Sequence, residues 1–215
     1  MRTRYALIYG NRQNCITVSN LILASGSAIR AKMLRDAGVD FSVDIPRVDE
    51  ETILRSLESE GAKPSDIADT LAEYKARRIA DKNPSSIVIA ADQILALNGQ
   101  IYSKPKDMAQ AREHLQALKG QGHQLLSAVV VYEDAKPVWR HVGCAQLAMR
   151  DFSDAFLDDY LAKTGPDILH CVGCYKLESD GVNLFSRVQG DYFTILGLPL
   201  LELLAFLRTR GALPT

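Results

Sequence analysis

The sequence contains no long hydrophobic run and no excess of charge of either sign. No apolar stretch reaches the roughly 18 residues that a membrane-spanning helix needs. The 25 basic and 26 acidic residues nearly cancel, and a net charge of −1 argues against a general polyanion binder such as a DNA-coating protein. We therefore expect neither a membrane nor a nucleic acid as a partner. Any phosphate that the protein binds must be held by a local site.

The first twenty residues lack the features of a signal peptide. They begin with two arginines, Arg2 and Arg4, and a short apolar patch, but polar residues 11–14 interrupt any signal-peptide core. We predict a cytoplasmic protein.

Cysteine is also scarce, with four residues in the chain. Cys171 and Cys174 form a CxxC motif, which is compatible with redox chemistry or with half of a zinc site. Only His170 and the distant Cys144 offer further ligands, and residues 175–177 are predicted to be extended rather than the start of a helix. We expect reduced, structural and mostly buried thiols.

The chain is long enough for one substantial core. Its 215 residues are 47% hydrophobic, which suits a single globular unit or two lobes that share one sheet. Residues 21–24 predict a strand and residues 28–37 a helix, and Ser25-Gly26-Ser27 forms the turn between them. Small residues in such a turn leave backbone N–H groups open to an anion at the helix N-terminus, although an ordinary strand-to-helix connection has the same composition.

Three charged residues lie within predicted helices or at the end of a predicted strand. Glu50 is one of three carboxylates, at 49–51, that open a predicted helix after a short strand at 41–45, where acidic residues are favourable by electrostatics alone. Lys75 lies within a predicted helix over 65–81 and would ordinarily be a solvated surface lysine. Asp92 follows the β-branched run 86–91, which predicts a buried strand. A carboxylate at the end of such a strand lies where open α/β sheets place ligands.

The remaining pattern alternates helices and strands. Asn98-Gly99 predicts a tight hairpin between 94–97 and 100–102, which could return Lys104 toward Asp92. The other expected elements are helices at 107–119, 154–163 and 200–210 and strands at 123–132, 138–150 and 183–188.

Seven blocks in order resemble the Maf family of nucleotide pyrophosphatases. They are LILASGSAIRAKML, IPRVDEE, LAEYKA, AADQILALNGQIYSKPKD, LKGQGHQLLSAVVV, GCYKLESDG and ILGLPL. The resemblance covers nearly all of 21–210, so we treat 21–215 as one catalytic domain and residues 1–20 as an extension outside the resemblance.

The resemblance implies a two-lobed α/β fold with a long, curved mixed sheet and a central cleft, similar to the inosine triphosphate pyrophosphatases. It implies hydrolysis of the bond between the α- and β-phosphates of nucleoside triphosphates, with a divalent metal such as magnesium, manganese or cobalt, and a homodimer. The residues that it assigns to triphosphate binding and to catalysis are Ser25, Gly26, Ser27, Arg30, Lys75, Lys104, Glu50 and Asp92. Glu50 and Asp92 supply hard oxygen ligands for the metal, and Asp92 is the proton acceptor.

Departures from the family motif bear on the preferred base. Ala28 replaces a usual proline, and Ile29 stands where one branch has arginine and another tryptophan. Gln93 and Glu178 match the branch associated with 7-methyl-GTP rather than the branch that prefers dTTP and UTP. Glutamate favours guanine, because its two oxygens can accept from the adjacent N1–H and 2-amino donors.

Three alternatives stay open at this stage. The first is a pyrophosphatase that prefers dTTP and UTP. The second is a nucleotide-binding regulator of cell division without catalytic activity, and the third is a CxxC redox or zinc protein.

Overall fold

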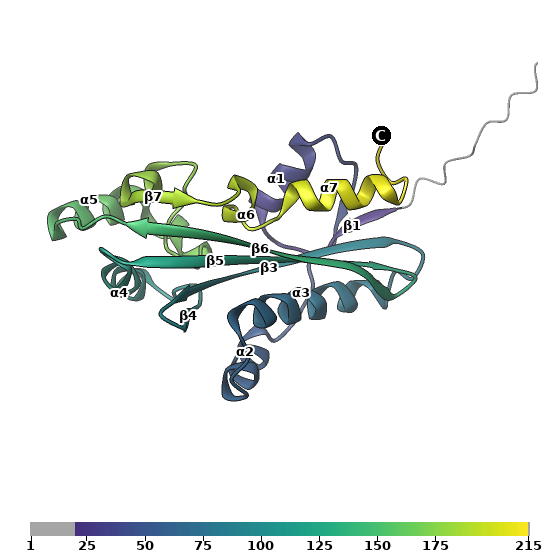
Figure 1. Cartoon of the computed structure of the whole chain (residues 1–215), viewed down its shortest axis with the longest axis horizontal. Coiled ribbons are helices and arrows are strands. Elements are labelled where there is room, and N and C mark those ends of the chain that lie inside the picture. Colours follow the sequence, from purple (N-terminus) through teal and green to yellow (C-terminus); the bar gives the residue numbers. More distant parts are fainter. Residues whose placement is uncertain (1–19, 215) are drawn as a thin grey trace, which may run out of the picture.

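A seven-stranded mixed sheet organises the chain in the computed structural model, which describes residues 20–214 (Figure 1). The main path of the sheet has the order β2-β1-β3-β5-β6-β7, and β4 pairs with β3 off this path. The strands are β1 (Leu21–Leu23), β2 (Ser42–Val43), β3 (Ile87–Leu97), β4 (Gln100–Tyr102), β5 (Gly122–Glu133), β6 (Lys136–Met149) and β7 (Phe185–Gln189).

The helices occupy most of the predicted positions. They are α1 (Ala28–Asp36), α2 (Glu50–Ser59), α3 (Pro64–Ala80), α4 (Met108–Leu118), α5 (Asp154–Thr164), the short α6 (Tyr192–Ile195) and α7 (Leu200–Thr209). Two 3₁₀ helices, η1 (Gly165–His170) and η2 (Asp180–Leu184), connect α5 to β7. The predicted α/β fold is confirmed.

The strand β3 is longer than the sequence suggested. It pairs in parallel with β1 over Leu21–Leu23 and in antiparallel register with β5 from Val88 to Ala96. The prediction that a strand ends at Asp92 was therefore wrong. The long partner β5 continues the ladder past the end of β1, so Asp92 lies within β3, at a point where β1 no longer covers that edge.

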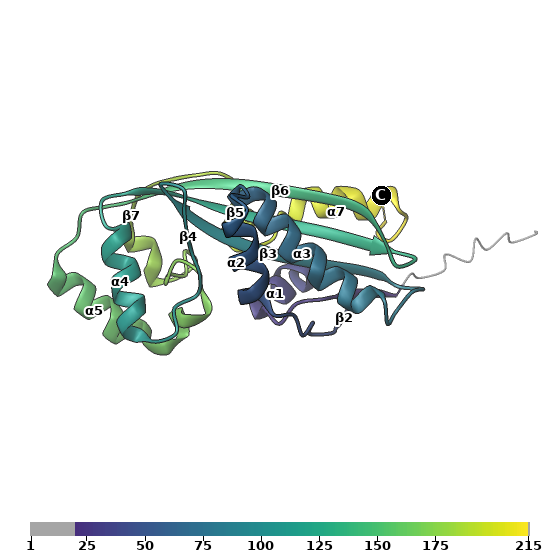
Figure 2. The same cartoon turned by 90° about the horizontal axis from the view of Figure 1, so that it is seen from below.

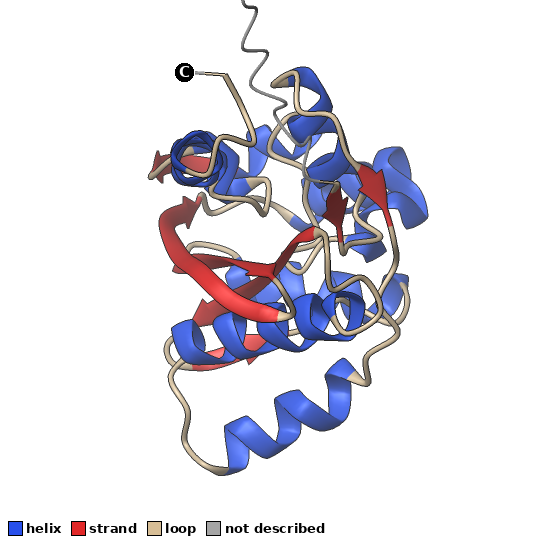
Figure 3. Ribbon diagram, turned by 90° about the vertical axis from the view of Figure 1, so that its right-hand side faces the viewer, coloured by secondary structure: helices blue, strands red, loops and turns tan. Residues whose placement is uncertain are grey.

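Helices cover both faces of the sheet where β1, β3 and β5 lie side by side. On one face, α1 and α7 pack their apolar residues against β1 and β3 and bury Leu34, Leu203 and Leu207. On the other face α3 buries Ile67 and Ile79, and the outlying helix α2 packs outside α3 (Figures 1 and 3). This three-layer part forms the first lobe.

The second lobe has its own core at the far end of the long strands (Figure 2). There α4, α5 and η1 pack against the ends of β3, β5 and β6, and Leu115, Leu157 and Ile168 are fully buried. Because β3, β5 and β6 run through both lobes, one continuous sheet joins the two cores.

Local turn predictions are confirmed where they depend on backbone conformation. Asn98 and Gly99 both have positive φ, at 52° and 82°, in the tight β3–β4 turn. Gly38, which follows the C-cap residue Ala37 of α1, also has positive φ, at 74°, as is common at a helix C-terminus. The expected strand at 41–45 is reduced to the two residues of β2, and residues 175–177 form no strand.

The hypothesis of an N-terminal extension falls almost wholly outside the described residues. Within 20–214, none of the helices has the length and apolar character needed to cross a membrane.

Candidate active site

A buried lysine and two carboxylates form the centre of the candidate site. Lys75 Nζ lies 2.5 Å from Asp92 Oδ1 and 2.9 Å from Glu50 Oε2. Lys75 and Asp92 are both buried, whereas the side chain of Glu50 remains half exposed. The expectation that Lys75 is a solvated surface residue was therefore wrong, because α3 turns this position toward β3.

Three elements bring these groups together. The 17-residue helix α3 packs closely along β3, which places Lys75 against the side chain of Asp92. Glu50 is the first residue of α2, and Asp49 caps that helix by accepting from the Thr52 amide at 3.1 Å. The Thr52 hydroxyl also donates to Asp49, at 2.8 Å, and both hydrogen bonds lower the pKa of Asp49. They fix the end of α2 from which Glu50 reaches Lys75.

Burial raises the pKa of Asp92, against the opposing effect of the positive charges of Lys75 and Arg30. A buried carboxylate with a raised pKa is a stronger proton acceptor than an exposed one. Asp92 therefore has the electrostatic environment of a general base, with its charge held in place by Lys75.

The strand-to-helix turn lies next to this cluster. Ser25 is buried, and its Oγ accepts a hydrogen bond of 3.2 Å from the Ser27 amide. Ser27 begins α1 as its N-cap, but its own hydroxyl makes no capping bond, and Gly26 is exposed. The N–H groups in the first turn of a helix have no intrahelical acceptor, so this end of α1 is suited to an anion.

Arg30 ties the turn to the cluster in a way that the sequence did not predict. Its Nε donates to the Gly197 carbonyl and its Nη1 to the Ala91 carbonyl, both at 2.7 Å, and Nη1 also lies 3.4 Å from Ser25 Oγ. Burial lowers the pKa of Arg30, and the charges of Asp92 and Glu50 oppose that effect. Internal carbonyls thus engage this cation, and within residues 20–214 its Nη2 has no acceptor.

Gln93 is held by a network that sequence reasoning missed. Its Nε2 lies 2.9 Å from the carbonyl of Ile195, 3.3 Å from that of Thr194 and 3.1 Å from Ser127 Oγ. The buried Ser127 hydroxyl in turn donates to the Thr194 carbonyl at 2.7 Å. Because carbonyls can only accept, they fix the amide nitrogen of Gln93 toward α6. The register of β3 with β5 places Gln93 opposite Ser127, and this register could not be read from the sequence.

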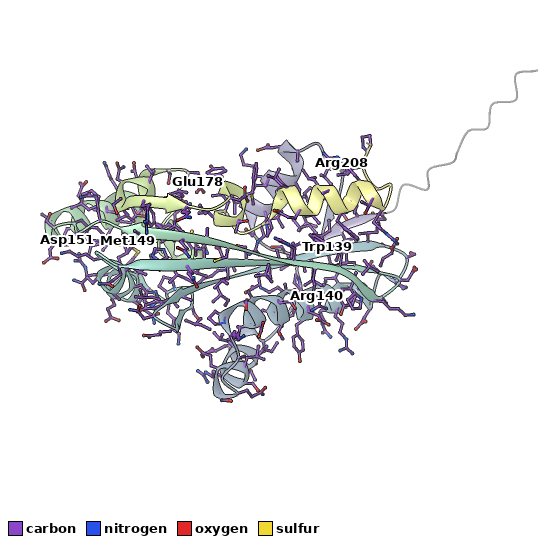
Figure 4. The ribbon with its side chains drawn as sticks, in the orientation of Figure 1. Trp139, Arg140, Met149, Asp151, Glu178 and Arg208 are labelled. Atoms are coloured by element: carbon purple, nitrogen blue, oxygen red, sulfur yellow. The ribbon has the colours of Figure 1, made fainter. Side chains whose placement is uncertain are left out.

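The other expected residues are not joined to the cluster. Lys104 is exposed and forms no ion pair within the described residues, and it is not among the charges that act on Asp92. Its charge acts instead on Cys171, as does the charge of the exposed Glu178, which Figure 4 labels. Ile29 is half-buried on α1. The hairpin forms as predicted, with Tyr102 opposite Leu95, but Lys104 is not among the charges that act on Asp92.

The expectation of mostly buried thiols was wrong, because Cys174 is the one buried cysteine within residues 20–214, whereas Cys171 is half-buried and Cys144 is exposed. Cys144, Cys171 and Cys174 are free, and Cys15 lies outside the described residues. Burial raises the pKa of Cys174 to about 12 and also raises that of Cys171, which disfavours the reactive thiolate. Cys174 Sγ lies 3.8 Å from His114 Nδ1, but no three potential ligands converge on a metal position within residues 20–214.

The acidic pair suits a hard cation better than the cysteines do. Glu50 and Asp92 each place one oxygen within 3 Å of the same ammonium, so both carboxylates already face one positive charge. Magnesium-type ions are commonly held by one or two carboxylates, with water and substrate phosphates as the other ligands. Two carboxylates thus fit such an ion when the substrate supplies further oxygens.

The fold and the geometry of the site together indicate a general class of protein. A mixed α/β sheet that carries a buried charge cluster beside a helix N-terminus is suited to binding and activating a phosphate-bearing ligand. Comparison with known proteins then identifies the family. Residues 20–210 match the family described as Maf-like protein, and the chain belongs to that family.

Individual relatives agree with this assignment. The chain is 58% identical over 194 residues to a nucleoside triphosphate pyrophosphatase of Roseobacter denitrificans, a match that covers 90% of this chain and 98% of the relative. It is 46% identical over 193 residues to a 7-methyl-GTP pyrophosphatase of Rhizobium meliloti, covering 90% of this chain and 97% of that protein.

Proposed function

We propose that this protein is a nucleoside triphosphate pyrophosphatase that hydrolyses the bond between the α- and β-phosphates. The observation that carries the proposal is the buried pair of Lys75 and Asp92, joined to Glu50 and adjacent to the turn at 25–27. The names of the relatives in the Maf family support the same activity. The products are a nucleoside monophosphate and pyrophosphate.

Asp92 is proposed to accept a proton from the attacking water. The water oxygen forms a bond to phosphorus at the α–β linkage, the bridging P–O bond breaks, and the pyrophosphate leaves with the electron pair. A raised pKa favours this role, because the carboxylate can accept the proton more readily. Lys75 holds Asp92 in place and supplies positive charge for the phosphates.

The turn at 25–27 is proposed to bind the triphosphate through backbone N–H groups at the start of α1 and the hydroxyl of Ser27. Arg30 contributes its charge and its Nη2 group and also fixes the position of Gly197. Lys104 is exposed and forms no ion pair with a described residue, and it is proposed to supply further positive charge for the phosphates.

Glu50 and Asp92 are the residues that would hold a divalent metal such as magnesium, manganese or cobalt. When bound, the metal supplies a positive charge that polarises phosphoryl oxygens. The cluster suits such an ion because both carboxylates already face one cation.

The base preference is proposed to be of the guanine type, with 7-methyl-GTP as a candidate substrate. Glu178 is exposed on the second lobe, where its carboxylate can accept from two adjacent donors (Figure 4). Gln93 presents its carbonyl oxygen, because its amide nitrogen is engaged by α6. A preference for dTTP and UTP is the competing assignment.

A panel of nucleotides with magnesium, manganese and cobalt tests the proposal. The purified protein is expected to release pyrophosphate and monophosphate in equal amounts, fastest from a guanine nucleotide. No release from any nucleotide with any of these metals would contradict the enzymatic function and favour a nucleotide-binding regulator. Faster hydrolysis of dTTP and UTP would contradict only the base preference. Cytoplasmic location and a homodimer remain predictions from the sequence.

A further inference from the structure

The ammonium of Lys75 lies between the two carboxylates that would hold a metal. It is 2.5 Å from Asp92 Oδ1 and 2.9 Å from Glu50 Oε2, and only about a tenth of its side chain is exposed. The lysine comes from α3, Asp92 from β3 and Glu50 from α2, so three elements converge on this one positive charge.

The ammonium contacts one oxygen of each carboxylate, so a divalent cation held by the same two groups would lie within a few ångströms of it. Two positive charges a few ångströms apart in a partly buried site repel each other strongly. Asp92 has little access to water that could screen this repulsion, since 9% of its side chain is exposed. A metal bound to both carboxylates would therefore bind more tightly if the ammonium moved away.

We propose that Lys75 acts as an internal cation that keeps Glu50 and Asp92 together and excludes a free divalent metal until a triphosphate is present. This inference rests on the proposed function and adds a control step to it. Lys75 is a positioning residue in this role, because it acts on metal binding through the two carboxylates.

The side chain of lysine can make such a movement. Its four-carbon stem is flexible, and its ammonium can exchange one anionic partner for another. Phosphates bound near the turn at 25–27 offer that new partner, because Ser25 is linked through Arg30 to the backbone next to Asp92. The nucleotide would thus open the metal position, and by thermodynamic reciprocity the metal would tighten nucleotide binding.

Binding of Mn²⁺ alone, measured by titration calorimetry, tests the inference without any hydrolysis. Lys75→Met removes the charge and keeps the length of the side chain. We expect this variant to bind Mn²⁺ at least about tenfold more tightly than the wild type. Lys63→Met is the matched control, because Lys63 precedes α3 and forms no ion pair with a described residue. This control should bind Mn²⁺ as the wild type does.

A second titration uses a non-hydrolysable α,β-methylene analogue of GTP. The factor by which Mn²⁺ tightens binding of this analogue is expected to be larger in the wild type than in Lys75→Met. Lys75→Gln repeats both measurements if the methionine variant does not fold. Circular dichroism checks folding in each case.

Equal or weaker Mn²⁺ binding in the folded Lys75 variants would overturn the inference, and so would undetectable Mn²⁺ binding in all of them. Either result leaves the proposed function standing if the wild type still releases pyrophosphate. Conversely, loss of the proposed function would appear as no hydrolysis by the wild type, whatever the titrations show.

Discussion

Asp92 is expected to be the residue on which turnover depends most. Asp92→Asn keeps the shape of the side chain but removes its negative charge, so it should lower turnover by about a hundredfold to ten-thousandfold. The measurement is pyrophosphate release at saturating nucleotide, with circular dichroism as the test of folding. Asp81→Asn, at the exposed end of α3, is the control and should remain active. A folded Asp92→Asn variant with near-normal turnover would remove Asp92 from the mechanism.

Glu178 is the residue at which base preference can be changed. Glu178→Gln replaces two acceptors by one acceptor and one donor, which suits uracil or thymine better than guanine. We expect the ratio of kcat/KM for 7-methyl-GTP or GTP over UTP to fall by roughly tenfold or more, because charge-assisted hydrogen bonds contribute about 1.5 to 3 kcal/mol. Asp180→Asn, in the neighbouring η2, is the control. An unchanged ratio would show that Glu178 does not contact the base.

At the scale of elements, the site depends on close packing of α6 against β6. A Cβ added at Gly143 would lie 2.7 Å from Thr194 Oγ1 and 2.9 Å from its Cγ2, and Thr194 is buried. Gly143→Ala should therefore displace α6 and lower the free energy of unfolding by about 1 to 3 kcal/mol. Because the α6 carbonyls hold Gln93, activity should fall as well.

The control for this element is Gly122→Ala in β5. The nearest atom to a Cβ there is the Leu147 carbonyl oxygen at 4.0 Å, so the added methyl group meets no obstacle. Urea unfolding of the two variants gives the comparison. Equal stability of both variants would mean that α6 is not packed as tightly as the structure indicates.

At the scale of the whole molecule, His123 makes stability depend on pH. It is buried in the second-lobe core, its Nε2 lies 2.8 Å from Tyr175 Oη, and burial lowers its pKa to about 4. In the unfolded chain the pKa of histidine is about 6.5, so between these values the unfolded state binds more protons. Stability should fall as pH decreases through this window, by roughly 3 kcal/mol in total.

Urea unfolding at pH 7 and pH 4.5 measures this effect. His123→Gln removes the titrating group and should show a smaller loss of stability over this interval than the wild type. His170→Gln, an exposed position in η1, should behave as the wild type does. If wild type and His123→Gln lose equal stability, the acid sensitivity comes from other groups.

Much of the fold could be predicted from the sequence because it depends on neighbouring residues. The hairpin at Asn98-Gly99 was predicted from two residues that accept positive φ. The helix expected at 154–163 is α5, which Ser153 caps. The length of β3 could not be found this way. Its continuation through Asp92 depends on the ladder with β5, which begins about 25 residues further along the chain.

The sequence by itself determined the order of helices and strands, the turns and the motifs that identify the family. These follow from local backbone preference and side-chain periodicity, which act over a few residues. Only the tertiary structure determined which charged side chains come into contact. Packing of α3 on β3 buries Lys75 against Asp92, and the backbone carbonyls of Ala91 and Gly197 engage Arg30. Lys104 is not among the charges that act on Asp92. Such contacts join residues distant in sequence, so only packing of the elements against one another can form them.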